Sequence, residues 1–168
     1  MINWIYYPKS DQPTSLSLQV VKVFEDVETA IESGVSGKSS NEVLAMLRPG
    51  LEQVGFTVES GKKASERIAV PVLFGRNGKP EKSFHADAYH EKEGYVIEVE
   101  AGRGVVNNQF LKDLFQACMM HDVEFLSIAV CNWYGSNRDF ESVERFFDTM
   151  YTSQRLQLPL KGILLVGY

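Results

Sequence analysis

The chain has 168 residues, of which 44% are hydrophobic and 23% charged, and this composition predicts one folded domain rather than a disordered chain. Its 17 basic and 22 acidic residues leave a net charge of −5, which argues against a protein that coats nucleic acid by charge alone. No apolar run could span a bilayer, no secretory signal is visible and only two cysteines occur, so we expect a cytoplasmic protein with no membrane partner.

The first third of the chain is predicted to be mainly helical. Residues 1–7 have the character of a short strand or arm, and apolar residues recur at helical spacing over 16–31. The glycine-containing segment 34–37 should end this helix. Ser39 then begins an N-capping sequence for a second helix. We expect Pro49 to kink or restart that helix, because its ring removes one backbone donor.

The middle of the chain is predicted to be rich in β-hairpins. Residues 56–59 and 67–74 have strand character, and the glycine-rich and proline-containing segment 75–80 forms a turn. Residues 82–90 and 94–101 alternate between polar and apolar on either side of a short turn. This pattern predicts a β-hairpin with one polar face.

The last third is predicted to alternate helices and buried strands. An amphipathic helix at 107–121 precedes an almost wholly apolar strand at 123–131. A capping sequence at 136–139 starts another helix, and 162–166 forms a last buried strand. The expected fold class is therefore α/β, a mixed sheet with helices on both faces, in which 95–131 is a right-handed parallel crossover.

Three carboxylates are predicted to share one face of the hairpin. Alternation directs Asp87 of the first strand and Glu98 and Glu100 of the second to the same side. A four-residue turn would set Asp87 opposite Glu98, and a two-residue turn would set it opposite Glu100. Directly opposite Cβ atoms lie about 4.5–5.5 Å apart, so the charges need raised pKa values, a neighbouring cation or a bound metal ion. The alternative interpretation is an ordinary polar hairpin face in solvent.

The order of elements around these acids resembles the PD-(D/E)XK nuclease superfamily, whose restriction-endonuclease-like fold has an α-β-β-β-α-β core. The resemblance covers roughly residues 39–131. Asp87 matches the first acid of the motif, and Glu98 matches its (D/E) position. Ala86 stands where the motif has proline and Glu100 where it has lysine, so this chain carries an E-x-E variant.

The resemblance implies a metal-dependent endonuclease, a hydrolase that cleaves phosphodiester bonds in DNA. It implies that Asp87 and Glu98 bind Mg²⁺ or Mn²⁺, and that Glu100 either completes the metal site or orients the attacking water. Glu42, near the start of the second helix, matches a glutamate that recurs in the superfamily and would be an outer ligand. Its alternative role is stabilisation of the helix N-terminus.

Polar side chains on the helix after the hairpin suit a nucleic-acid contact. Gln109, Lys112 and Gln116 fall on one helix face, where amide and ammonium groups can meet phosphate oxygens. Either Lys112 or Arg103, in the preceding loop, would supply the positive charge that the motif lysine normally provides. A solvated helix face is the alternative interpretation, and Asp113, expected on the same surface, argues against a face that only attracts DNA.

A loose basic set in the loops before the hairpin is predicted to form a rim that follows phosphates. Its members are Lys62, Lys63, Arg67, Arg76, Lys79 and Lys82. An ordinary solvated surface is the alternative. This rim would offset the net negative charge of the chain.

The predicted organisation is a single domain, 1–168, with an N-terminal arm and helix at 1–38, a nuclease-like core at 39–131 and a C-terminal helix and strand at 132–168. Little chain remains outside the core to read bases, so we expect a homodimer or a partner subunit on DNA. The alternative function is a catalytically degenerate domain that acts as a nucleic-acid-binding or assembly module. Glu100 in the lysine position and the net charge of −5 favour that alternative.

Overall fold

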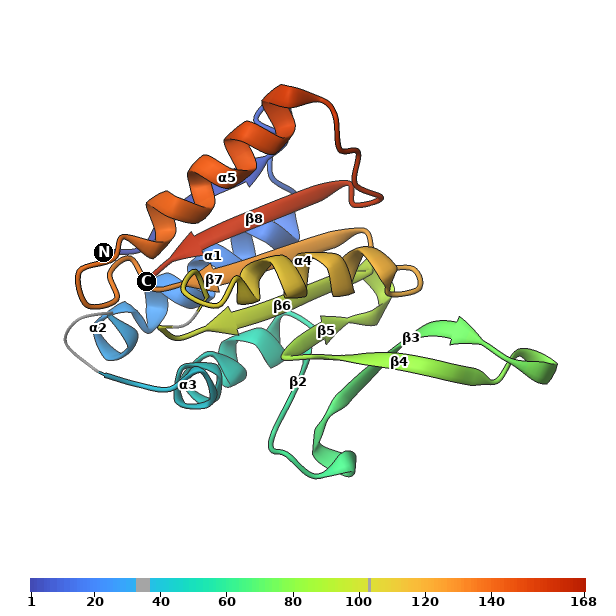
Figure 1. The fold of residues 1–168 in the computed structure, drawn as a ribbon. Coiled ribbons are helices and arrows are strands. Elements are labelled where there is room, and N and C mark those ends of the chain that lie inside the picture. Colours follow the sequence, from blue (N-terminus) through green and yellow to red (C-terminus); the bar gives the residue numbers. More distant parts are fainter. Residues whose placement is uncertain (33–36, 103) are drawn as a thin grey trace.

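A six-stranded mixed sheet forms the centre of the structure, a computed structural model that describes residues 1–32, 37–102 and 104–168 (Figure 1). Its strand order is β1-β8-β7-β6-β5-β2. The strands are β1 Asn3–Tyr7, β2 Thr57–Val58, β5 Ala88–His90, β6 Tyr95–Glu100, β7 Phe125–Val130 and β8 Gly162–Gly167. Strands β6, β7 and β8 are parallel, whereas β1, β5 and β2 pair antiparallel with their neighbours. The predicted mixed α/β class is confirmed.

Helices cover both faces of this sheet (Figure 1). They are α1 Ser15–Asp26, α2 Glu28–Ile31, α3 Ser40–Gln53, α4 Gln109–Met119 and α5 Asp139–Ser153, with short 3-10 turns η1 Ala64–Glu66, η2 Arg76–Gly78 and η3 Glu91–Glu93. Phe24 of α1 and Leu47 of α3 join one apolar core, and Leu114 of α4 and Phe147 of α5 join the other. The sheet therefore separates two cores, and every strand of it except β2 contributes to both by alternation.

A separate two-stranded sheet projects from the body of the molecule (Figure 1). It consists of β3 Ile68–Phe74 and β4 Pro80–Ala86, paired antiparallel. The prediction of one continuous strand over 82–90 is wrong, because the chain pairs with β3 only as far as Ala86 and enters the main sheet at Ala88. The intervening residue, Asp87, therefore lies at the corner between two sheets.

The β5–β6 hairpin has the four-residue turn that was one of the two expected registers. His90 pairs with Tyr95 and Ala88 with Ile97. Continued by one residue, this register sets Asp87 opposite Glu98. Strand β6 then leads through α4 to β7, with which it is parallel, as the apolar pattern predicted.

Two predictions about the first helices need qualification. Helix α3 runs from Ser40 to Gln53 through Pro49, so the expected restart at the proline does not occur. The predicted helix stop at 34–37 lies, apart from Gly37, outside the described residues, and α2 ends at Ile31. In the three described ranges, no helix combines the length and apolar character needed to cross a membrane.

Candidate acidic site

A cleft of about 530 Å³ opens between strand β4, the end of β6 and helix α4. Two lysines, Lys82 and Lys112, contribute to its lining, together with polar residues such as His85 and Gln116. Its acidic side chains come from four separate parts of the chain: Glu59, Asp87, Glu98, Glu100 and Asp113. The fold therefore brings together carboxylates from four separate segments of the sequence.

Backbone hydrogen bonds fix the position of Asp87. The amide of Glu59, just after β2, donates to the Asp87 carbonyl oxygen over 2.7 Å. The Asp87 side chain reaches β6, where its Oδ2 accepts a hydrogen bond of 2.8 Å from the Val99 amide. Because Val99 lies between Glu98 and Glu100 in sequence, the Asp87 carboxylate is held beside the acidic end of β6.

Two of the carboxylates are deeply buried. Glu98 is 9% exposed on β6, and Asp113 is 4% exposed on α4. Oδ2 of Asp113 is buried and has no hydrogen-bond partner among the described residues. The Lys112 ammonium lies 4.0 Å from Asp113 Oδ1, but its side chain is 56% exposed, so solvent weakens this pairing.

Burial is the largest cause of raised pKa values throughout the cluster. It raises the pKa of Asp87 to about 6 and that of Glu98 well above its ordinary range, with repulsion from neighbouring carboxylates adding to both. Burial also raises the pKa of Glu100 to about 7 and that of Asp113 to about 6. The cluster therefore keeps its protons to a higher pH than free carboxyl groups do, because burial disfavours the charged forms.

The structure brings most of the predicted site residues into one cleft. Asp87, Glu98 and Glu100 all line it, as do Lys112 and Gln116 from α4. The shared face expected from the hairpin alternation accounts for the first three, and the helical spacing accounts for the last two.

Three predicted site residues are not part of this lining. Glu42 lies in a neighbouring pocket, where its Oε2 accepts hydrogen bonds from the Ser39 amide at 2.8 Å and the Ser39 hydroxyl at 2.7 Å. These bonds lower the pKa of Glu42 and form a capping box at the start of α3. Gln109 is not among the residues that line the cleft, and Arg103 lies outside the described residues.

Sequence reasoning missed Glu59 and the inward direction of Asp113. Asp113, which is expected on the outer surface of the helix, is instead buried with Phe110, Leu114 and Ala117. Positions 110, 114 and 117 define the inward face of α4, and position 113 falls on the same face at helical spacing. The helical spacing of the sequence therefore predicts that Asp113 is buried, whereas the charge of its side chain predicts that it is exposed.

The carboxylate oxygens of the cleft are the right type of ligand for a hard divalent cation, but they are not positioned around a common point. Among the described residues, no three His, Cys, Asp or Glu side chains are grouped so that they could hold a metal ion as they stand. The cleft nevertheless offers carboxylate oxygens from Asp87, Glu98 and Glu100, and the buried Oδ2 of Asp113 has no donor. Mg²⁺ and Mn²⁺ prefer such ligands.

Comparison with known proteins does not assign this site. A scan of the chain against models of protein families gives no match, and a search of curated proteins gives none either. The interpretation of the cleft therefore depends on its own geometry and chemistry.

Proposed function

We propose that this protein is a metal-dependent endonuclease that hydrolyses phosphodiester bonds in DNA at the acidic cleft. The convergence of Asp87, Glu98, Glu100 and Asp113 in one partly buried cleft is the observation that supports it. Their raised pKa values mean that folding holds them together at a cost in free energy. A divalent cation bound by these carboxylates would offset that cost and could activate a water molecule for hydrolysis.

The order of elements supports a restriction-endonuclease-like assignment. Helix α3 is followed by the antiparallel run β2-β5-β6, then by α4 and the parallel strand β7. This is the α-β-β-β-α-β order that the sequence resemblance implies, with β3 and β4 as an inserted hairpin. Asp87 directly precedes the second of these strands and Glu98 lies on the third, as in the PD-(D/E)XK motif.

The cleft residues divide into metal-holding and phosphate-directed groups in this proposal. Asp87 and Glu98 would hold Mg²⁺ or Mn²⁺, which when bound supplies an activated water and neutralises phosphate charge. Glu100, with a pKa of about 7, would orient the attacking water and accept its proton. Lys112, exposed at the edge of the cleft, would stabilise the negative charge that develops on the phosphate.

A second candidate function is a catalytically degenerate module that binds DNA without cutting it. Two observations favour it: Glu100 occupies the position of the motif lysine, and the described acidic side chains do not form a ready three-ligand site. In either function, a homodimer or a partner subunit would help to select the target, and two sites would be needed to cut both strands.

Plasmid cleavage tests the proposal. Supercoiled and linear DNA are incubated with the protein in Mg²⁺, Mn²⁺ or EDTA, beside Asp87→Asn and Glu98→Gln variants. Glu52→Gln is the matched control, because Glu52 is an exposed glutamate of α3 outside the cleft. Metal-dependent nicking that both cleft variants lose and the control keeps would support the endonuclease. DNA binding without cleavage would favour the degenerate module, and the absence of both would contradict both functions.

A further inference from the structure

The projecting hairpin carries a charge opposite to that of the rest of the protein. Residues 67–82, which we call the β3–β4 arm, contain four basic residues and one acidic residue, a net charge of +3. Because the whole chain has a net charge of −5, the remaining residues carry −8. A segregation of this size creates a local positive potential on an acidic protein.

The basic residues of the arm are not paired with carboxylates in the described parts of the chain, although the Lys82 ammonium lies 5.5 Å from the centre of the Phe84 ring. These basic residues are Arg67, Arg76, Lys79 and Lys82, and all four are exposed. Their charges are therefore available to an external anion.

The base of the arm is anchored and its tip is exposed. Val70 is 1% exposed and packs into the core under α4, while the Pro71 carbonyl oxygen accepts a 2.8 Å hydrogen bond from the His121 amide. At the far end of β3, Leu73 and Phe74 are 58% and 46% exposed. Figure 1 shows the two strands extending beyond the body of the molecule in this direction. A two-stranded ribbon of this kind fits the major groove of DNA, which is about 12 Å wide.

The arm continues directly into the acidic cleft. Lys82 belongs to β4 and lines the cleft, followed along the same strand by Ser83, Phe84 and His85. Lys112 lines the cleft from helix α4. A phosphate backbone that followed β4 would thus pass from the basic arm to the carboxylates.

We propose that the β3–β4 arm binds the phosphate backbone of duplex DNA and supplies the attraction that the acidic cleft lacks. The position of the arm beside the cleft makes it the element that delivers a phosphodiester to the site. That delivery role depends on the proposed endonuclease function, whereas DNA binding by the arm does not. The two can therefore be tested separately.

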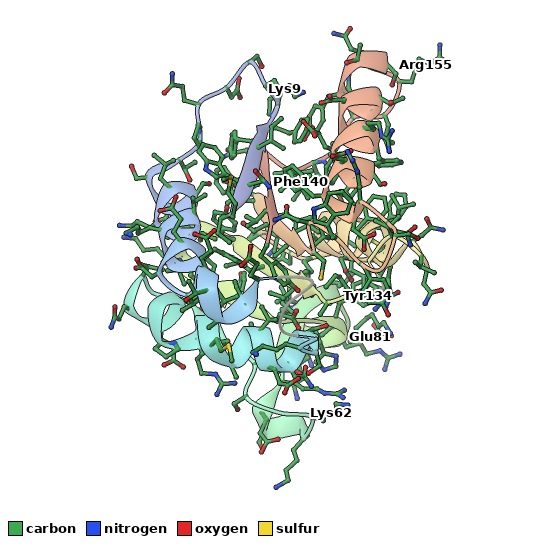
Figure 2. All side chains as sticks on the ribbon, turned by 90° about the vertical axis from the view of Figure 1, so that its left-hand side faces the viewer. Lys9, Lys62, Glu81, Tyr134, Phe140 and Arg155 are labelled. Carbon is green, nitrogen blue, oxygen red and sulfur yellow. The ribbon has the colours of Figure 1, made fainter. Side chains whose placement is uncertain are left out.

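The test measures the affinity for a short fluorescent DNA duplex by anisotropy in EDTA, where no metal supports cleavage. The arm variant is Arg76→Glu combined with Lys79→Glu, two exposed changes near the tip. The matched control is Arg155→Glu, which is also exposed and has no ion pair among the described residues. In Figure 2, Arg155 lies at the top of the molecule, whereas Lys62, which precedes the arm, lies near the bottom.

The arm variant should bind the duplex at least about tenfold more weakly and lower the slope of log affinity against log salt by about two. The control should bind like the original protein. The inference is overturned if the original protein does not bind the duplex, if both variants lose affinity equally, or if single-stranded DNA or an RNA duplex binds more tightly. If the arm variant alone loses DNA binding but the original protein never cuts DNA, the arm inference survives and the endonuclease does not.

Discussion

The carboxyl group of Glu100, at the end of strand β6, lines the same cleft as that of Asp113, in the second turn of α4, and repulsion between the two adds to burial in raising the pKa of Glu100. The pKa of Glu100 is about 7 and that of Asp113 is about 6. The two groups therefore hold protons at a higher pH than free carboxyl groups do. Their burial makes the site sensitive to pH between about 4 and 7.

The metal-free protein should lose stability as the pH rises from about 4 to about 7. Asp87, Glu98, Glu100 and Asp113 all have raised pKa values, so the folded state keeps protons that the unfolded chain releases in this range. The free energy of unfolding then decreases with pH. Each pKa unit corresponds to about 1.4 kcal/mol, so the shift of the Asp87 pKa to about 6 is worth about 3 kcal/mol. Thermal unfolding in EDTA at a series of pH values measures the effect.

The source of that pH dependence can be assigned with one variant. Asp113→Asn removes a titrating group from the cleft and should flatten the fall in melting temperature between pH 4 and 7. Glu59 and Lys112 also line the cleft and remain in the variant. An unchanged slope in Asp113→Asn would show that Asp113 does not contribute to this pH dependence.

Glu98→Gln should stabilise the metal-free protein at pH 8 and remove its response to Mg²⁺. The substitution keeps the shape of a side chain that is 9% exposed but removes its repulsion by Asp87, Asp113 and Glu100. In the original protein, Mg²⁺ at about 100 times its dissociation constant should add about 2.7 kcal/mol to the free energy of unfolding. Melting temperatures with Mg²⁺ and with EDTA measure both effects, and Glu52→Gln should behave like the original protein. A Glu98→Gln protein that is less stable and still responds to Mg²⁺ would contradict the metal site.

The acidic core of the site could be predicted from sequence because it depends on local geometry. Strand alternation and a four-residue turn are enough to set Asp87 beside Glu98. The change of sheet at Asp87 could not be predicted in this way, since the alternation over 82–90 continues without interruption. The choice between β3 and β6 as the partner strand is made by tertiary packing.

Two further residues show where sequence reasoning favoured the wrong signal. Asp113 has the helical spacing of a buried residue, but its charge suggested an exposed one. Glu42 follows Ser39 by three residues, which is the local signature of a capping box, yet the family resemblance suggested an outer ligand. In both cases the short-range geometric signal agreed with the structure.

Ser39→Ala should destabilise the protein without affecting the cleft. The Ser39 hydroxyl accepts a hydrogen bond from the Glu42 amide at 3.4 Å, and loss of an N-cap of this kind costs about 1 kcal/mol. Chemical denaturation should detect this loss, while the change of melting temperature with Mg²⁺ should be the same as in the original protein. If Glu42→Gln instead abolished the response to Mg²⁺, Glu42 would have to be returned to the metal site.

Gly94→Ala should be the more damaging of two matched glycine substitutions. Gly94 closes the β5–β6 turn with a φ of +58°, and an added Cβ would collide with the Asp122 carbonyl oxygen. The Gly94 carbonyl oxygen also accepts hydrogen bonds from the Glu124 and Phe125 amides at 2.8 and 3.0 Å, so a shift of the turn would disturb the start of β7. The combined strain and collision should cost about 3 kcal/mol or more.

The control for this prediction is Gly78→Ala in the turn of the β3–β4 arm. Gly78 has a similar φ of +70°, but an added Cβ would meet no atom within 4 Å. Its substitution should therefore cost only the backbone strain, about 1 kcal/mol. The difference between the two variants, measured by denaturant unfolding, isolates the contact between the hairpin turn and Asp122. Equal losses would mean that this contact does not fix the hairpin, and that the register setting Asp87 opposite Glu98 is held by the strands alone.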